Sequence, residues 1–163
     1  MNAQDIIRSS QLTHVRELQT ALRKAADENA ALHDELNSLK AHFDMALLAA
    51  MDLKGDEPLE IWDGWNLILG AKKAAKDRAD LIAQAKASGK RVWIVLDGHD
   101  ENVKLDGNVR ISYTGGAGEH RADKFIIDFV RMAAYLGLAG KLTVRTNDKD
   151  FRKAVERLLA DVL

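Results

Sequence analysis

Three aspartates follow apolar runs that have the composition of short β-strands. Asp63 directly follows residues 59–62, Asp97 directly follows residues 91–96, and Asp148 comes three positions after the run 141–145. If these strands are parallel, their carboxyl ends meet at one edge of the sheet, where open α/β sheets bind their ligands. We therefore expect the three carboxylates to converge on that edge.

A fourth carboxylate comes from the helix predicted over residues 119–136. On a helical wheel its buried stripe contains Ile126, and Asp123 falls inside that stripe, whereas Asp128 falls on the opposite, solvated face. A carboxylate on a buried stripe is costly unless something pairs with it. Asp123 is therefore the fourth candidate, and Asp128 needs no special explanation.

Converging carboxylates repel one another, and their pKa values rise unless a cation neutralises them. The chain has no cysteine, which excludes thiolate catalysis and zinc–thiolate sites. Hard oxygen ligands instead select Mg²⁺ or Mn²⁺, which can activate water and stabilise the leaving oxygen of a phosphodiester. Each aspartate also has a plainer interpretation: Asp63 and Asp97 precede glycines and suit turns, while Asp148 or Asp150 suits a helix cap.

Strand and helix patterns alternate from residue 59 onward. The predicted strands cover residues 59–62, 91–96, 109–113 and 141–145, and the predicted helices cover 67–88, 119–136 and 149–159. This alternation implies right-handed crossovers and a mainly parallel sheet between helix layers, that is, a three-layer α/β sandwich.

A change in charge separates this region from the N-terminus. Residues 1–57 carry a net charge of −4 and residues 58–163 a net charge of +3, and the break coincides with a turn cluster around the single proline, Pro58. We predict an N-terminal helix over residues 1–54 and an α/β domain over 58–163.

The N-terminal helix carries a heptad pattern typical of a coiled coil. Its seam, spaced alternately by three and four residues, is Val15, Leu18, Leu22, Ala25, Asn29, Leu32, Leu36, Leu39, Phe43 and Ala46. Asn29 falls at an a position, which favours a parallel dimer in a single register. An amphipathic helix packed on its own domain is the alternative.

The α/β region resembles the NYN domain, in the YacP-like branch of the PIN-like nuclease superfamily. The similarity rests on four motifs of the chain: Ile61-Trp62-Asp63-Gly64-Trp65-Asn66-Leu67, Val95-Leu96-Asp97-Gly98, Ala122-Asp123 and Thr146-Asn147-Asp148. It extends over about residues 59–160. The resemblance implies a PIN-like sheet and a metal-dependent endoribonuclease that cuts RNA.

The resemblance also implies roles for individual residues. Asp63, Asp123 and Asp148 would be the metal-binding carboxylates, Asp97 would stand nearby, and Asn66 would orient the first aspartate or a water molecule. Glu119, one turn before Asp123, and Asp150 are accessory candidates.

Five further residues near the predicted edge can contact nucleic acid. Trp65 can stack on a base, although core packing is the favoured explanation of this tryptophan. Phosphates can be held by the basic residues Arg121, Lys124, Lys149 and Arg152, for which a solvated helix face is the alternative.

The sequence contains no apolar stretch long enough to cross a membrane and no secretory signal, so we expect a cytoplasmic protein. The favoured function is a Mg²⁺- or Mn²⁺-dependent endoribonuclease, dimerised by the coiled coil. The alternative is a non-catalytic coiled-coil adaptor or RNA-binding module with a vestigial nuclease fold.

Overall fold

The computed structural model describes residues 3–98, 101–115 and 120–160. Its elements are helix α1 (Ala3–Asp52), strand β1 (Leu59–Asp63), helices α2 (Gly64–Leu69) and α3 (Arg78–Ala87), strands β2 (Arg91–Leu96), β3 (Glu101–Asp106) and β4 (Val109–Thr114), helix α4 (Arg121–Tyr135), a 3₁₀ turn η1 (Ala139–Lys141), strand β5 (Leu142–Arg145) and helix α5 (Lys149–Ala160). No helix in these ranges is long and apolar enough to cross a membrane.

The strands form one mixed sheet in the order β3-β4-β2-β1-β5. The four strands predicted from the sequence are present, and they pair in parallel. Only β3 runs antiparallel, against β4. The carboxyl ends of β4, β2, β1 and β5 therefore lie at one edge, as predicted.

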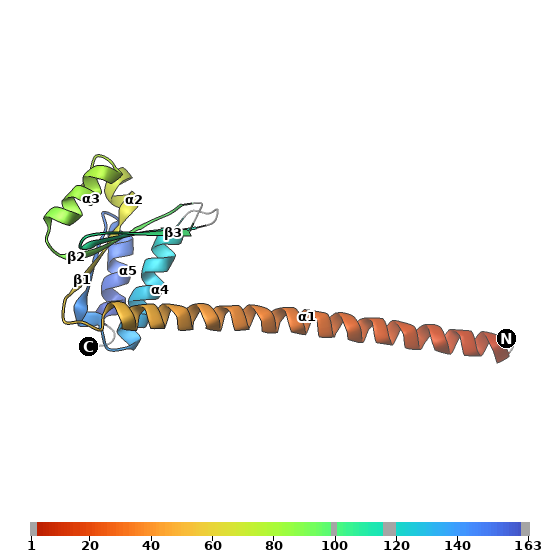
Figure 1. Ribbon diagram of the computed structural model, residues 1–163. Helices are drawn as coiled ribbons and strands as arrows, with labels where there is room; N and C mark the ends of the chain where they lie inside the picture. Colours follow the sequence, from red (N-terminus) through yellow and green to blue (C-terminus); the bar gives the residue numbers. More distant parts are fainter. Residues whose placement is uncertain (1–2, 99–100, 116–119, 161–163) are drawn as a thin grey trace. The chain divides into compact units, whose positions relative to one another are not determined.

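Both faces of the sheet are covered by helices (Figure 1). Alternate strand side chains point to opposite faces, so Ile61 and Val95 pack with α4, α5 and the end of α1. Trp62 and Ile94 pack with α2 and α3 on the other face. Two separate apolar cores result, one on each face of the sheet.

The prediction of a single helix over residues 67–88 is wrong, because two helices joined by a loop at residues 70–77 occupy this region. The first helix ends at Gly70, where a Cβ atom would lie 2.3 Å from the carbonyl oxygen of Asn66. The second begins after Asp77, whose carboxylate accepts a hydrogen bond from the Asp80 N–H at 2.8 Å. The apolar periodicity continues across both helices and hides the break.

Strand β3 was not predicted from the sequence. It forms a hairpin with β4 through Gly107, whose φ of +65° lies in the left-handed region that favours glycine. The alternation of Val103 and Leu105 with polar residues, followed by Asp106-Gly107, was the available signal.

The chain divides into two compact units, Met1–Ala41 and His42–Leu163. The second unit begins inside α1, earlier than the predicted start at residue 58, because the last turns of the helix belong to its core. Ala49 and Leu53 are fully buried there, and Met45 and Leu48 pack against them.

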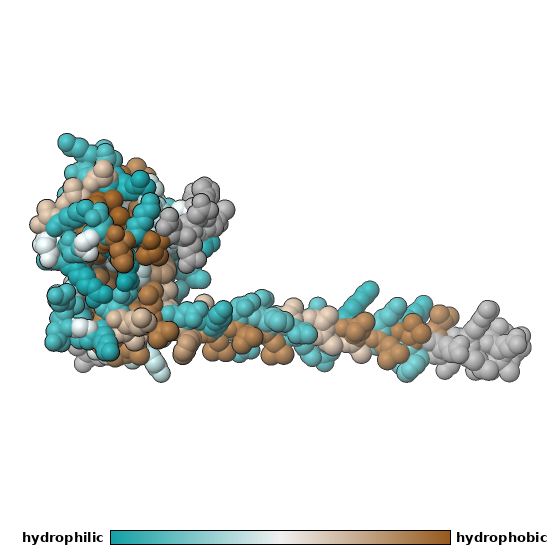
Figure 2. Space-filling view, in the orientation of Figure 1, coloured by the Kyte–Doolittle hydropathy of each residue, from teal (hydrophilic) through white to brown (hydrophobic). Residues whose placement is uncertain are grey.

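The first unit consists of the N-terminal part of α1. Its predicted heptad residues are exposed, with values from 48% at Val15 to 72% at Leu22. Apolar side chains gather along one side of this helix in Figure 2. Among the described residues of this unit, none forms a hydrophobic core that covers the seam.

Candidate functional site

Asp63 is the buried carboxylate at the end of β1, with 3% of its surface exposed. The Thr146 hydroxyl donates to its Oδ2 at 2.7 Å, and the Asn66 N–H approaches its Oδ1 at 3.4 Å, at the start of α2. The chain after it is closely packed, since a Cβ at Gly64 would lie 2.4 Å from Leu96 Cδ2. Packing against β2 therefore requires glycine at this position.

The pKa of Asp63 is raised from 3.8 to about 6, mainly by burial. The nearby charges of Asp123 and Asp148 contribute to this rise, and the hydrogen bonds from Thr146 and from the Asn66 N–H oppose it. The predicted metal-binding carboxylates are thus close enough to repel one another. No Lys or Arg in the described ranges forms an ion pair with Asp63.

Hydrogen bonds tie the end of β5 to the start of α2. The Asn66 Oδ1 accepts from the Asn147 N–H at 2.8 Å, and the Thr146 Oγ1 accepts from the Asp148 N–H at 3.1 Å. Asn66 therefore orients the loop that carries Asp148, and Thr146 orients Asp63. Sequence reasoning did not select Thr146, although a hydroxyl residue at a strand end two positions before an aspartate was a signal.

Asp123 lies in the first turn of α4, and its Oδ2 is 3.0 Å from the Nδ1 of His120. Its side chain is 34% exposed, whereas that of Asp128 is 24% exposed and pairs with Arg131 at 3.1 Å. The prediction that Asp128 lies on a solvated face is therefore wrong. The wheel gives the angle of a side chain on its helix, but not how far neighbouring elements cover it.

Asp97 holds the start of α4. Its Oδ1 accepts the Ala122 N–H at 2.6 Å and the Thr114 hydroxyl at 3.2 Å, which satisfies a free N–H of the first helical turn. The adjacent chain is closely packed, since a Cβ at Gly98 would lie 2.8 Å from Tyr113 Cδ1. Asp97 thus positions the helix that presents Asp123.

Asp148 caps α5, as the plainer interpretation of this residue predicted. Its Oδ1 accepts from the N–H groups of Asp150 at 2.8 Å and Phe151 at 3.0 Å. Asp150 is exposed and lies 3.8 Å from Lys153. The accessory candidate Glu119 lies outside the described residues.

The five nucleic-acid candidates lie at the surface. Trp65 is 37% exposed and its indole N–H donates to the Asp97 carbonyl at 2.8 Å, which fixes the ring beside the edge. The guanidinium groups of Arg121 and Arg152 donate to the carbonyl oxygens of Thr114 and Thr146. Lys124 and Lys149 are exposed.

The donor chemistry at this edge fits a hard cation, although no three His, Asp or Glu side chains of the described ranges already form a metal-binding group. Asp97, Asp123 and Asp148 each use one carboxylate oxygen in the hydrogen bonds above. The second oxygen of each carboxylate accepts no hydrogen bond from the described residues and can bind a cation. With Asp63 they provide oxygen donors of the kind that Mg²⁺ and Mn²⁺ prefer.

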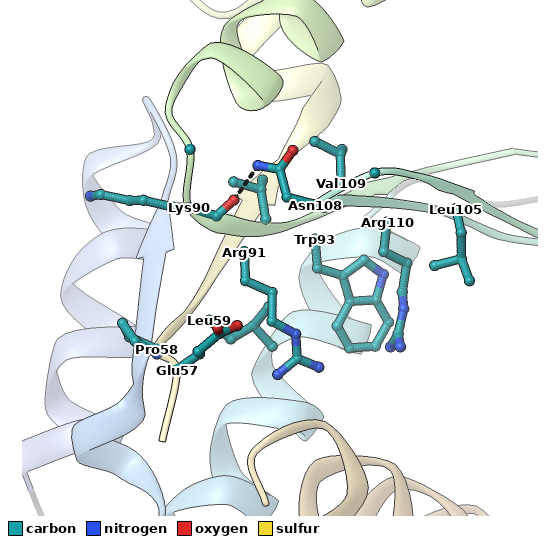
Figure 3. A pocket seen from close by; sticks show the side chains of 13 residues that line it. Glu57, Pro58, Leu59, Lys90, Arg91, Trp93, Leu105, Asn108, Val109 and Arg110 are labelled. Carbon is teal, nitrogen blue, oxygen red and sulfur yellow. Dashed lines mark hydrogen bonds between the residues drawn. The ribbon is translucent and has the colours of Figure 1, made fainter. Parts of the chain in front are cut away.

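A pocket of about 640 Å³ lies at the opposite edge, where β1, β2 and β4 begin (Figure 3). The side chains of Arg91, Trp93 and Arg110 lie side by side there. Both arginines bind Asp52 near the end of α1, so this pocket adjoins an ion cluster that anchors the helix. It is remote from the carboxylates of the candidate site.

Comparison with protein-family models, curated proteins and solved structures finds no match to this chain. The similarity to NYN domains therefore remains a prediction from the motifs alone.

Proposed function

We propose that this protein is a metal-dependent endoribonuclease that hydrolyses RNA at the carboxyl edge of its sheet. The observation that carries the proposal is the placement of Asp63, which is buried beside Asp123 and Asp148 and has no basic partner among the described residues. A carboxylate cluster of this kind costs stability, and a bound cation would offset the repulsion. Helices on both faces of a mainly parallel sheet are compatible with a three-layer, PIN-like architecture.

Asp63, Asp123 and Asp148 would hold Mg²⁺ or Mn²⁺. When bound, such an ion supplies a Lewis acid that lowers the pKa of water and offsets charge on the phosphodiester. The Thr146 hydroxyl fixes the Asp63 carboxylate, and Asn66 fixes the loop that carries Asp148. Asp97 holds α4, so that Asp123 stays beside the other two.

Cleavage of labelled single-stranded RNA, with Mn²⁺ or with a chelator, tests this proposal. Asp63→Asn and Asp123→Asn are each expected to reduce the rate by roughly 10²-fold or more, as loss of a key electrostatic group does. Asp128→Asn is the matched control, because Asp128 is on the same helix but is neutralised by Arg131. Wild-type rates in both site variants, or cleavage that persists in chelator, would refute the proposal.

The exposed seam supports dimerisation through a parallel coiled coil. Leu22, Leu32 and Leu36 are each more than 60% exposed along one side of α1, and a second copy would cover such a stripe. Removal of residues 1–41 should leave the second unit folded and convert the dimer to a monomer, so that the mass measured by light scattering falls to less than half. A full-length monomer at micromolar concentration would contradict the dimer.

One observation favours the adaptor as a second candidate. Asp97 and Asp148 both serve as helix caps, so two of the four carboxylates have a purely structural explanation. Under that alternative, no metal-dependent RNA cleavage would be measured, and Asp63→Asn would leave partner binding unchanged.

A further inference from the structure

The loop between α2 and α3 is basic. Residues 70–77 contain three lysines, Lys72, Lys73 and Lys76, and one acidic residue, Asp77, whose carboxylate caps α3 by accepting the Asp80 N–H. All three lysines are exposed, and none forms an ion pair within the described ranges. Their ammonium groups are therefore available to an anionic ligand.

Hydrogen bonds hold the start of this loop beside the carboxylates. The Lys72 carbonyl accepts from Asn147 Nδ2 at 2.6 Å, and the Asn147 N–H donates to Asn66 Oδ1. The Gly70 N–H also donates to the Asn66 carbonyl at 2.9 Å. Because Asn147 directly precedes Asp148, the backbone of Lys72 is fixed next to the loop that carries a metal-binding candidate.

The other end of the loop is fixed at a different strand. Arg78, the first residue of α3, donates to the Tyr113 hydroxyl at 2.5 Å, and Tyr113 lies at the carboxyl end of β4. The ends of β4 and β5 flank those of β2 and β1, which carry Asp97 and Asp63. The basic segment is thus anchored on both sides of the carboxylate edge.

We propose that residues 70–78 bind the sugar-phosphate backbone of a single-stranded RNA and hold it against the carboxylate edge. This inference rests on the proposed function, because it identifies the path of that substrate. The carboxylates repel a polyanion, and cations at a fixed distance from them compensate for this repulsion. The half-exposed Trp65 indole, fixed by its bond to Asp97, offers a stacking surface that an unpaired base can use.

The test measures RNA binding by fluorescence anisotropy in chelator, so that it does not depend on cleavage. The full-length variant Lys72→Gln/Lys73→Gln/Lys76→Gln is compared with Lys40→Gln/Lys54→Gln/Lys104→Gln, which removes the same charge from exposed lysines elsewhere. At about 0.1 M salt we expect the loop variant to bind roughly 10–100-fold more weakly, and its salt dependence to decrease by about two ion equivalents. The control is expected to bind nearly as the wild type does.

Equal weakening in both variants would overturn the inference, and so would wild-type affinity in the loop variant. Tighter loop-dependent binding of duplex than of single-stranded RNA would overturn the single-strand part. The proposed function fails separately: if wild-type protein shows loop-dependent binding but no Mn²⁺-dependent cleavage, the binding surface stands and the nuclease proposal falls.

Discussion

Two buried aspartates at opposite edges of the sheet have very different surroundings. Asp52, 5% exposed, lies where β2 and β4 begin, and the guanidinium groups of Arg91 and Arg110 both bind its carboxylate. Asp63, 3% exposed, lies where β1 ends, and its partners are a hydroxyl and a backbone N–H. Its neighbours Asp123 and Asp148 add repulsion to the cost of burial.

The difference indicates what each carboxylate contributes. A buried charge is tolerated when opposite charges and hydrogen bonds compensate it. Asp52 meets that condition within the protein and joins α1 to the sheet. Asp63 does not meet it, and groups kept at a cost in stability are typical of functional sites.

Replacing Asp52 should have the largest effect on stability. Asp52→Asn leaves Arg91 and Arg110 without their counter-charge, and we expect a loss of roughly 2–4 kcal/mol in the free energy of unfolding, measured in urea. The range is reduced because the two arginine side chains are 31% and 27% exposed. In the control Asp106→Asn, the surface pair with Lys86 is lost, at a cost of up to about 1 kcal/mol. Equal losses of stability in the two variants would contradict the conclusion that Asp52 is compensated by its buried ion pairs.

Replacing Asp63 should increase the free energy of unfolding near neutral pH, whereas replacing Asp52 should decrease it. The pKa of Asp63 is about 6 in the folded protein against an ordinary 3.8, so the folded state binds more protons between these values and loses stability as the pH rises through them. Asp63→Asn avoids this penalty. We expect a gain of about 2–3 kcal/mol above pH 6 that disappears below about pH 4.

The measurement is the difference in the free energy of unfolding between Asp63→Asn and wild type across that pH range. A difference independent of pH, or a loss of stability at pH 7, would show that the Thr146 hydrogen bond outweighs burial and repulsion.

Much of the sheet could be predicted from the sequence, because its parallel strands are short runs rich in apolar residues, and β1, β2 and β4 end at or just before an aspartate or glycine. The long helix before β2 was mispredicted. Gly70 was a local signal for the end of its first part, but the bond from Asn147 Nδ2 to the Lys72 carbonyl, which holds the following loop, is a tertiary contact with no local signal. The edge strand β3 is polar on one side and has only a weak pattern.

The placement of the aspartates at the carboxyl ends of the strands was predictable, as was the Asp148 cap, whereas the other contacts of these residues were not. Asp63 was predictable from its place after β1. The function of Asp97 as a cap for α4 depends on a contact with Ala122, 25 residues away, which no spacing rule contains. The hydroxyl of Thr146 likewise reaches Asp63 only because β1 and β5 are neighbours.

The most direct test of the central claim is the melting temperature of the metal-free protein titrated with Mg²⁺ or Mn²⁺. At ten times its dissociation constant, a bound ion should stabilise the wild type by about 1.4 kcal/mol, or roughly 3–6 °C. Asp63→Asn should melt higher than wild type without metal and show a smaller shift with it, while Asp128→Asn should respond as the wild type does. A wild type that does not respond at millimolar concentrations, or an Asp128→Asn shift reduced as much as that of Asp63→Asn, would contradict a metal site at this edge.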